Sequence, residues 1–173
     1  MLNSILVAVD GSVHSEKALK QAIDLAKKYD ARLAIVHVHL HGRPVEEFSR
    51  MNEVEHMFEK TRNHFSGDRG TTKGSSLADL MENAEESYQV VTFLGDLILG
   101  SARDAATSSG LEKVMIHSRS GDYADGILDV AEDVCPDTIV IGHRGLGRFR
   151  QFVLGSVSNK VMLNAKCSVF VVR

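Results

Sequence analysis

The stretch Asp137-Thr138-Ile139-Val140-Ile141-Gly142-His143-Arg144-Gly145 carries an apolar run directly into a pair of glycines. Nine residues later the chain continues with Gly155-Ser156-Val157-Ser158 and a helical pattern that reaches Ala165. The apolar run predicts a buried strand, so the glycines fall where a strand turns into a helix. Glycine has no Cβ and lets backbone N–H groups approach an anion, while the unpaired amides of a helix start add partial positive charge. The pattern predicts a phosphate-binding turn, to which the hydroxyls of Ser156 and Ser158 could contribute.

The distribution of charge supports an anionic ligand in this part of the chain. Residues 138–173 contain six basic residues and no Asp or Glu. The first 137 residues hold the other 14 of the 20 basic residues and all 23 acidic residues, which gives them a net charge of −9. An anion would therefore be steered to the C-terminal segment.

Composition excludes several classes of protein. The chain has 173 residues, of which 43% are hydrophobic, and this suits one domain with a sizeable core. A net charge of −3 and a pI near 6.2 argue against nucleic-acid or membrane-surface binding, which needs a broad basic face. We find neither a run of the roughly 20 apolar residues that a membrane span needs nor a signal-peptide pattern. Cys135 and Cys167 lack metal-site spacing, and we expect a cytoplasmic protein.

Apolar runs and helical patterns alternate along most of the chain. Strands are predicted at 4–10, 32–38, 113–117, 137–142 and 168–172, and helices at 15–29, 104–111, 122–134 and 156–165. This alternation predicts an α/β fold with an open, doubly wound parallel sheet of five strands and helices on both faces. Ligands bind such sheets beyond the carboxyl ends of the strands, where the winding reverses. Asp10, Val38 and Gly142 are predicted to lie at such ends.

The segment from about residue 42 to residue 94 fits the alternation least. It predicts a helix at 46–64, a polar glycine-rich loop at 66–76 and a further helix at 77–99. The loop contains Lys73-Gly74-Ser75, but a Walker A loop needs Gly-Lys-Ser/Thr after an apolar strand, so we reject that motif. We interpret residues 1–173 as one domain that carries this extra helical and loop segment.

Four motifs together resemble the universal stress protein family, and specifically its ATP-binding branch. They are Val9-Asp10-Gly11-Ser12, His37-Val38, Gly121-Asp122 and Gly142-x2-Gly145-x9-Gly155-Ser156. The resemblance covers residues 1–41 and roughly 95–173. It implies the strand order 3-2-1-4-5, an ATP molecule over the carboxyl ends of the first and fourth strands, and a homodimer.

The resemblance also implies a set of nucleotide-binding residues. They are Asp10, Val38, Gly142, Gly145, Gly155, Ser156, Val157 and Ser158. Asp10 would lie beside the ribose or a metal ion, and Val38 would offer its backbone to the adenine. The first two glycines would line the ribose and phosphates. The last four residues would hold the phosphates, with a divalent cation such as Mg²⁺ or Mn²⁺ alongside.

Each of these assignments has a plainer alternative. The glycines could form a tightly packed turn without a ligand, and Asp10 could be a loop-closing or helix-capping carboxylate. His37, His39 and His41 alternate and so share one strand face, where they could chelate a metal ion. No fourth ligand cluster accompanies them, which favours structural histidines.

Three functions stay open at this point. The first is a homodimeric ATP-binding protein that senses or signals stress, with slow or no hydrolysis; its apolar final strand, 168–172, would be covered by pairing with a second copy. The second is a dimeric adaptor in which the phosphate-binding turn holds no nucleotide and the 42–94 segment binds an unknown protein partner. The third is a slow adenine-nucleotide hydrolase that uses Asp10 and a divalent ion. The sequence shows no base with an orienting partner, so no catalytic residue is predicted.

Overall fold

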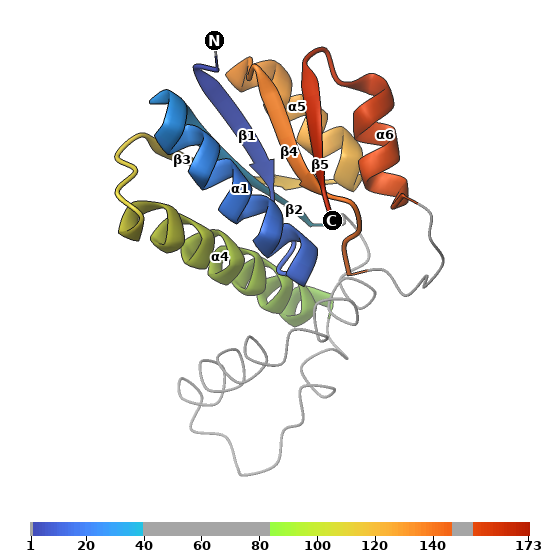
Figure 1. The fold of residues 1–173 in the computed structure, drawn as a ribbon. Coiled ribbons are helices and arrows are strands. Elements are labelled where there is room, and N and C mark those ends of the chain that lie inside the picture. The colour runs from blue at the N-terminus through green and yellow to red at the C-terminus, as the bar shows by residue number, and fades with distance from the viewer. Residues whose placement is uncertain (1, 40–83, 147–153) are drawn as a thin grey trace.

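A five-stranded parallel sheet forms the centre of the computed structural model, which describes residues 2–39, 84–146 and 154–173 (Figure 1). The strands are β1 (Ser4–Ala8), β2 (Arg32–His39), β3 (Val114–Ser120), β4 (Thr138–Gly142) and β5 (Ser168–Val172). The helices are α1 (Val13–Tyr29), α4 (Ala84–Ser108), α5 (Tyr123–Val134) and α6 (Ser156–Asn164). The strand order is β3-β2-β1-β4-β5 and every pairing is parallel, which confirms the predicted fold class and strand order.

Helices cover both faces of the sheet because its central strands are apolar on both sides (Figure 1). Ile5 and Val7 of β1 pack into the core shared with α1 and α4. Leu6 and Ala8 point the other way, into the core shared with α5 and α6. Alternate side chains of one strand thus anchor two helical layers.

Polar side chains cap the start of two helices, α1 and α5. The Ser12 side chain accepts a hydrogen bond from the Ser15 amide at 3.2 Å and caps α1. Asp122 caps α5 in the same way, because its Oδ1 accepts from the amides of Ala124 and Asp125. These caps give amides in the first turn of each helix a hydrogen-bond acceptor.

One prediction about the helices is wrong. Sequence analysis expected separate helices at 77–99 and 104–111, whereas a single helix, α4, runs without a break from Ala84 to Ser108. Buried residues continue across the expected break at Ile98, Leu99, Ala102 and Ala106. Gly100 lies on the open side of the helix, where a Cβ would meet nothing within 4 Å. The predicted helix at 46–64 and loop at 66–76 lie outside the described residues.

No helix in the described ranges has the length and apolarity needed to cross a bilayer. The longest, α4, carries the charged residues Asp96, Arg103 and Asp104.

We expect Gly126→Ala to destabilise the protein. A Cβ at Gly126 would lie 2.8 and 2.9 Å from the two methyl carbons of Val38, whose β-branched side chain adjusts poorly. Overpacking costs about 1–3 kcal/mol, and the better helix propensity of alanine offsets about 0.5–1 kcal/mol of it. Urea denaturation should therefore show a net loss of about 1–2 kcal/mol.

The control for this change is Gly100→Ala, which should leave stability unchanged or raise it, since open space surrounds that position. In a Val38→Ala background the cost of Gly126→Ala should shrink. An equal cost in both backgrounds would show that the contact with Val38 does not explain the glycine.

Candidate functional site

The candidate site lies at the carboxyl ends of β1 and β4, which are neighbours in the sheet. From β1 the chain crosses through α1 to β2 on one side, and from β4 it crosses through α6 to β5 on the other. In doubly wound sheets, ligands bind between the loops that leave two strands arranged in this way. We call this place the switch-point crevice; its described borders are residues 9–15, 142–146 and 154–158.

Asp10 joins the two loops across the crevice. Its Oδ1 accepts from the amide of Ser12 at 3.0 Å, and its Oδ2 accepts from the amide of Leu146 at 3.1 Å. The plainer alternative, a loop-closing carboxylate, is thus what the structure shows. The role of Asp10 beside a ribose or metal ion stays a prediction.

The first two glycines of the motif are required by packing within the protein. A Cβ on Gly142 would lie 2.9 Å from the backbone carbonyl of His14 in the first turn of α1. A Cβ on Gly145 would collide with Oδ2 of Asp10. Any side chain at either position would push the two loops apart.

No side chain of the described residues caps the amino end of α6. Its N-cap is Gly155, and the first intrahelical bond runs from the Asn159 amide to the Gly155 carbonyl at 2.9 Å. The amides of Ser156, Val157 and Ser158 precede that bond, so they have no acceptor in the helix. Together with the helix dipole they form a place for an anion.

Ser158 has a structural bond of its own. Its side chain is buried, and its hydroxyl donates to the carbonyl of Gly142 at 2.8 Å. This bond ties the first turn of α6 to the end of β4. The proposed contact of that hydroxyl with a phosphate stays a prediction, while the Ser158 amide keeps its place in the open helix end.

The peptide groups of β2 alternate in direction between its two neighbouring strands. The amide of Leu33 donates to Lys113 next to β3, so odd-numbered residues face that strand. The carbonyl of Val36 accepts from Val9 at 2.9 Å, so even-numbered residues face β1. Pairing with β1 stops at Val36, and the N–H and C=O of Val38 therefore point past the end of β1 toward the crevice.

His37 occupies the acceptor that Val38 would reach if the pairing continued. Its Nδ1 lies 2.8 Å from the Val9 carbonyl, which assigns the proton to Nδ1. The side chain is buried under α4, where a Cβ at Gly95 would lie 3.0 Å from the imidazole Cδ2. Burial lowers the pKa of His37 below its usual value of 6.5.

The histidine metal site that the sequence left open gains no support from the described residues. The rings of His37 and His39 are 6.4 Å apart, and Nε2 of His39 lies 2.5 Å from the hydroxyl of Ser120. His41 lies outside the described residues. Within the described ranges no group of three or more His, Cys, Asp or Glu side chains could hold a metal ion.

Sequence analysis missed His14 and gave no role to His143. The two imidazoles meet edge to face in the crevice wall, with ring centroids 4.4 Å apart. The pKa of His14 is lowered by burial first, then by the positive charges of His143, Lys17 and Arg144. Position 14 precedes the apolar stripe of α1 and carries no periodic signal. Only its place in a strand-to-helix turn, like that of His143, pointed to it.

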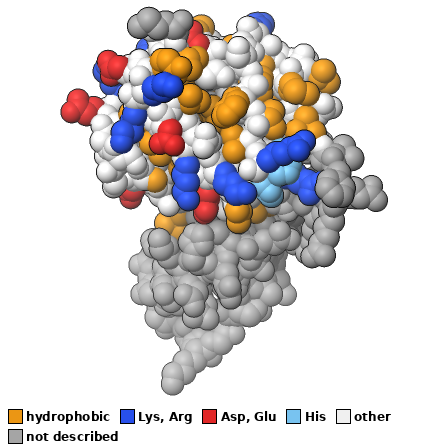
Figure 2. Space-filling model, in the orientation of Figure 1, with side chains coloured by type: hydrophobic (Ala, Val, Ile, Leu, Met, Phe, Trp, Pro, Cys, Tyr) orange, Lys and Arg blue, Asp and Glu red, His pale blue; other side chains and the backbone are white. Residues whose placement is uncertain are grey.

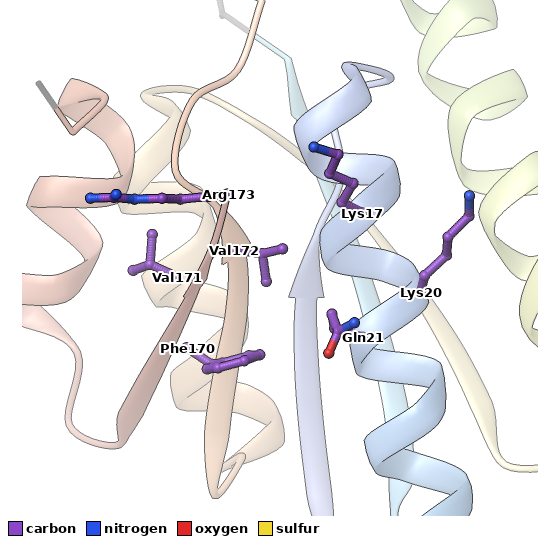
Figure 3. A pocket seen from close by; sticks show the side chains of 7 residues that line it. All are labelled: Lys17, Lys20, Gln21, Phe170, Val171, Val172 and Arg173. Carbon is purple, nitrogen blue, oxygen red and sulfur yellow. The ribbon is translucent and has the colours of Figure 1, made fainter. Parts of the chain in front are cut away.

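A pocket of about 390 Å³ lies beside the crevice, between α1 and β5 (Figure 3). Phe170 and Val172 face it from β5, and Lys17 and Arg173 lie at its upper end. Its lining consists of Lys17, Lys20, Gln21, Phe170, Val171, Val172 and Arg173. None of the predicted nucleotide-binding residues lines it, so this pocket and the switch-point crevice are different places.

Comparisons with known proteins agree with one another. The model of the universal stress protein family matches residues 1–173 of this chain. Universal stress protein YxiE of Bacillus subtilis is 32% identical over 178 residues, which cover 100% of both chains. Two solved structures share the fold at 22% identity: a universal stress protein in complex with cAMP (TM-score 0.62, covering 99% of this chain and 97% of that one) and the Archaeoglobus fulgidus protein in complex with dAMP (TM-score 0.60, covering 100% of both).

We expect stability to fall as the pH drops, in part because of His37. Its pKa in the folded state lies below the unfolded value of 6.5. Between these two pKa values the unfolded chain therefore binds a proton at this histidine and the folded chain does not. The stabilisation is complete above pH 6.5 and is lost as the pH falls toward the folded pKa. One such group contributes a slope of at most about 1.4 kcal/mol per pH unit.

Urea denaturation between pH 5 and pH 7.5 measures this slope. His37→Asn should flatten it, because the amide nitrogen can still donate to Val9 but does not titrate. The matched control is His117→Asn, in the edge strand β3, where the side chain is only partly buried and the change in slope should be smaller. An unchanged slope in His37→Asn would contradict the assignment.

Proposed function

This chain belongs to the universal stress protein family, and from that premise we propose that it binds an adenine nucleotide in the switch-point crevice and acts as a stress-response sensor or signalling protein. The observation that carries the proposal is the uncapped amino end of α6, which opens at the carboxyl ends of β1 and β4. Three amides with no helical acceptor converge there, and this is a common site for phosphate groups.

The edge of β2 supplies a partner for the base. Adenine presents a hydrogen-bond donor and acceptors along its edges, and the N–H and C=O of Val38 offer one group of each kind toward the crevice. Gly126 lets α5 approach the Val38 side chain closely, and so helps to fix this strand end. The proposal thus gives the base and the phosphates separate sets of main-chain groups.

Positive charge gathers on the same side of the molecule. Figure 2 shows Lys, Arg and His side chains grouped over the carboxyl ends of β1, β4 and β5. Of the six basic residues in 138–173, Lys160 pairs with Asp122 and Asp125, and Lys166 pairs with Glu132. Arg144 and Arg173 follow the carboxyl ends of β4 and β5, and their charge at this end of the sheet suits an anion. The two complexes with cAMP and dAMP are observations on those proteins, and they support an adenine nucleotide as the ligand class.

We take ATP with Mg²⁺ or Mn²⁺ as the ligand, with slow or no hydrolysis. The cation would lie against the phosphates and reduce their mutual repulsion. Asp10 is the carboxylate that borders the crevice, and its two oxygens already accept from the amides of Ser12 and Leu146. A carboxylate held in this way supports binding better than it supports activation of water.

We further propose a homodimer through the free edge of β5. Within the described sheet β5 is the outermost strand beyond β4, and its Phe170 is 45% exposed. The neighbouring helix α6 exposes Met162 and Leu163, at 46% and 72%. Figure 2 shows hydrophobic side chains on the face that carries these elements. A second copy would cover the apolar side chains and pair the strand edge.

Isothermal titration with ATP and Mg²⁺ tests the nucleotide site. Ser156→Pro removes one amide donor at the first position of α6, where proline is well tolerated and where Gly155 already has the extended conformation (φ −60°, ψ 147°) that suits a residue before proline. We expect affinity to fall about ten- to a hundredfold, since a hydrogen bond to a charged group contributes roughly 1.5–3 kcal/mol.

Ser156→Ala is the matched control, because it removes the hydroxyl and keeps the amide. Thermal melts should show both variants folded. If the wild-type protein gave flat titrations with ATP and AMP, with Mg²⁺ and with Mn²⁺, the nucleotide proposal would fail and the adaptor hypothesis would gain. Equal affinity in Ser156→Pro and wild type would remove the α6 amides from the site.

The dimer is tested by light scattering after size exclusion. Phe170→Lys should convert the dimer to a monomer, because it places a charge on the paired edge. Ile116→Lys is the matched control: Ile116 is 43% exposed on β3, at the opposite edge of the sheet. Both variants should keep their helical circular dichroism. A dimer that survives Phe170→Lys would exclude this edge as the interface.

A further inference from the structure

Two imidazoles form part of the wall of the switch-point crevice. His14 belongs to the first turn of α1 and His143 follows β4, and their rings meet nearly at right angles (89°), with centroids 4.4 Å apart. Because the backbone carbonyl of His14 would lie 2.9 Å from a Cβ on Gly142, the two residues are held together by main-chain packing as well as by their rings.

His143 connects this pair to the open helix end. Its amide donates to the carbonyl of Val172 at 2.7 Å, and its Nδ1 lies 3.2 Å from the same oxygen. Its own carbonyl accepts from the Gly155 amide at 2.9 Å, directly before the uncapped amides of α6. The imidazole pair and the α6 amides therefore border the same space.

The surroundings of His14 are electropositive in the absence of a ligand. Lys17 lies one turn further along α1, Arg144 follows His143, and Arg173 lies with Lys17 at the neighbouring pocket. Asp10 is the acidic group that acts against them. Burial and the positive charges of His143, Lys17 and Arg144 lower the pKa of His14, and the positive end of the α1 dipole acts in the same direction. A neutral imidazole is therefore the resting form at neutral pH.

An anion in the crevice reverses this balance. A phosphate group near the pair supplies the negative charge that favours an imidazolium, and more strongly when it carries two charges than when it carries one. A linear nucleotide ends in a phosphate that is dianionic above its second pKa of about 6, whereas a cyclic phosphodiester is a monoanion at any neutral pH. The two kinds of ligand should thus differ in how they affect His14.

We propose that His14, in edge-to-face contact with His143, is a specificity-determining residue of the crevice that takes up a proton when a nucleotide with a terminal phosphate binds, and so favours linear adenine nucleotides over cyclic ones. The proton comes from solvent and rests on the imidazole, and no bond of the nucleotide changes. The inference rests on the proposed nucleotide site and names the class of ligand that this site prefers.

Titration calorimetry with ATP in EDTA, between pH 7.0 and pH 8.5, tests this inference. The terminal phosphate of ATP, with a pKa of about 6, is mostly dianionic over that range. Its residual titration near pH 7 would raise affinity as the pH rises, so a fall in affinity reports on the protein. The linkage limit for one proton is about tenfold per pH unit. We expect wild-type affinity to fall roughly three- to tenfold between the two pH values, and the heat to differ between two buffers of unequal ionisation enthalpy, as proton uptake requires.

Two ligands and three variants complete the design. With cAMP the wild-type affinity should depend on pH more weakly than it does with ATP, because the cyclic phosphate carries one charge. His14→Gln should bind ATP with no pH dependence and a smaller preference over cAMP, and His143→Gln should reduce the dependence. His117→Gln, in β3, should behave as the wild type. Thermal melts identify any variant that fails to fold, and the buffer comparison on the wild type stands without them.

The possible results distinguish a failure of the His14 proposal from a failure of the proposed nucleotide site. If ATP binds and His14→Gln keeps the wild-type pH dependence, or if the wild type takes up no proton, then His14 is only a packing residue and this inference is overturned. If no adenine nucleotide binds the wild-type protein under any condition, the proposed function fails, and the His14 proposal fails with it because it depends on that site.

Discussion

The carboxylate of Asp10 determines the shape of the switch-point crevice. It lies at the end of β1 and accepts from the amide of Leu146 in the loop that leaves β4. Since these two strands are neighbours whose connections run to opposite sides of the sheet, their loops would otherwise diverge freely. A charged acceptor that reaches across holds them at a fixed distance, and Gly145 gives it room.

Much of the fold was predictable because burial on both faces leaves a clear pattern. The apolar runs that became β1, β2 and β4 admit few alternatives, and their separation by amphipathic helices specifies parallel pairing. The break predicted near residue 100 was wrong: Gly100 and Ser101 have lower helix propensity than their neighbours, yet α4 continues through both. The apolar stripe of α4 against the sheet outweighs that propensity, and Gly100 lies on its open side.

The candidate site was predictable only in part, because its most informative features are relations between segments. That Asp10, Val38 and Gly142 fall at strand ends follows from the chain itself. The direction of the Val38 peptide groups depends on where β1 stops pairing, which is set by contacts between strands. The contact of His14 with His143 joins positions 129 residues apart, and neither position carries a periodic signal. The sequence pattern can identify such residues one by one, but it does not show that they are in contact.

The glycines of the motif need a more careful interpretation than a phosphate cradle alone. Gly142 and Gly145 are explained by close packing against His14 and Asp10, so alanine at either position would disturb the fold before it could report on a ligand. Among the described residues, other main-chain groups are left without a partner: the first amides of α6, and the Val38 peptide groups beyond the end of β1. Glycine spacing thus sets the architecture, while the unpaired main-chain groups carry the binding hypothesis. Any ligand of the crevice must contact those groups. Main-chain N–H donors in a strand-to-helix turn are fixed in direction, whereas side chains can rotate away from a ligand.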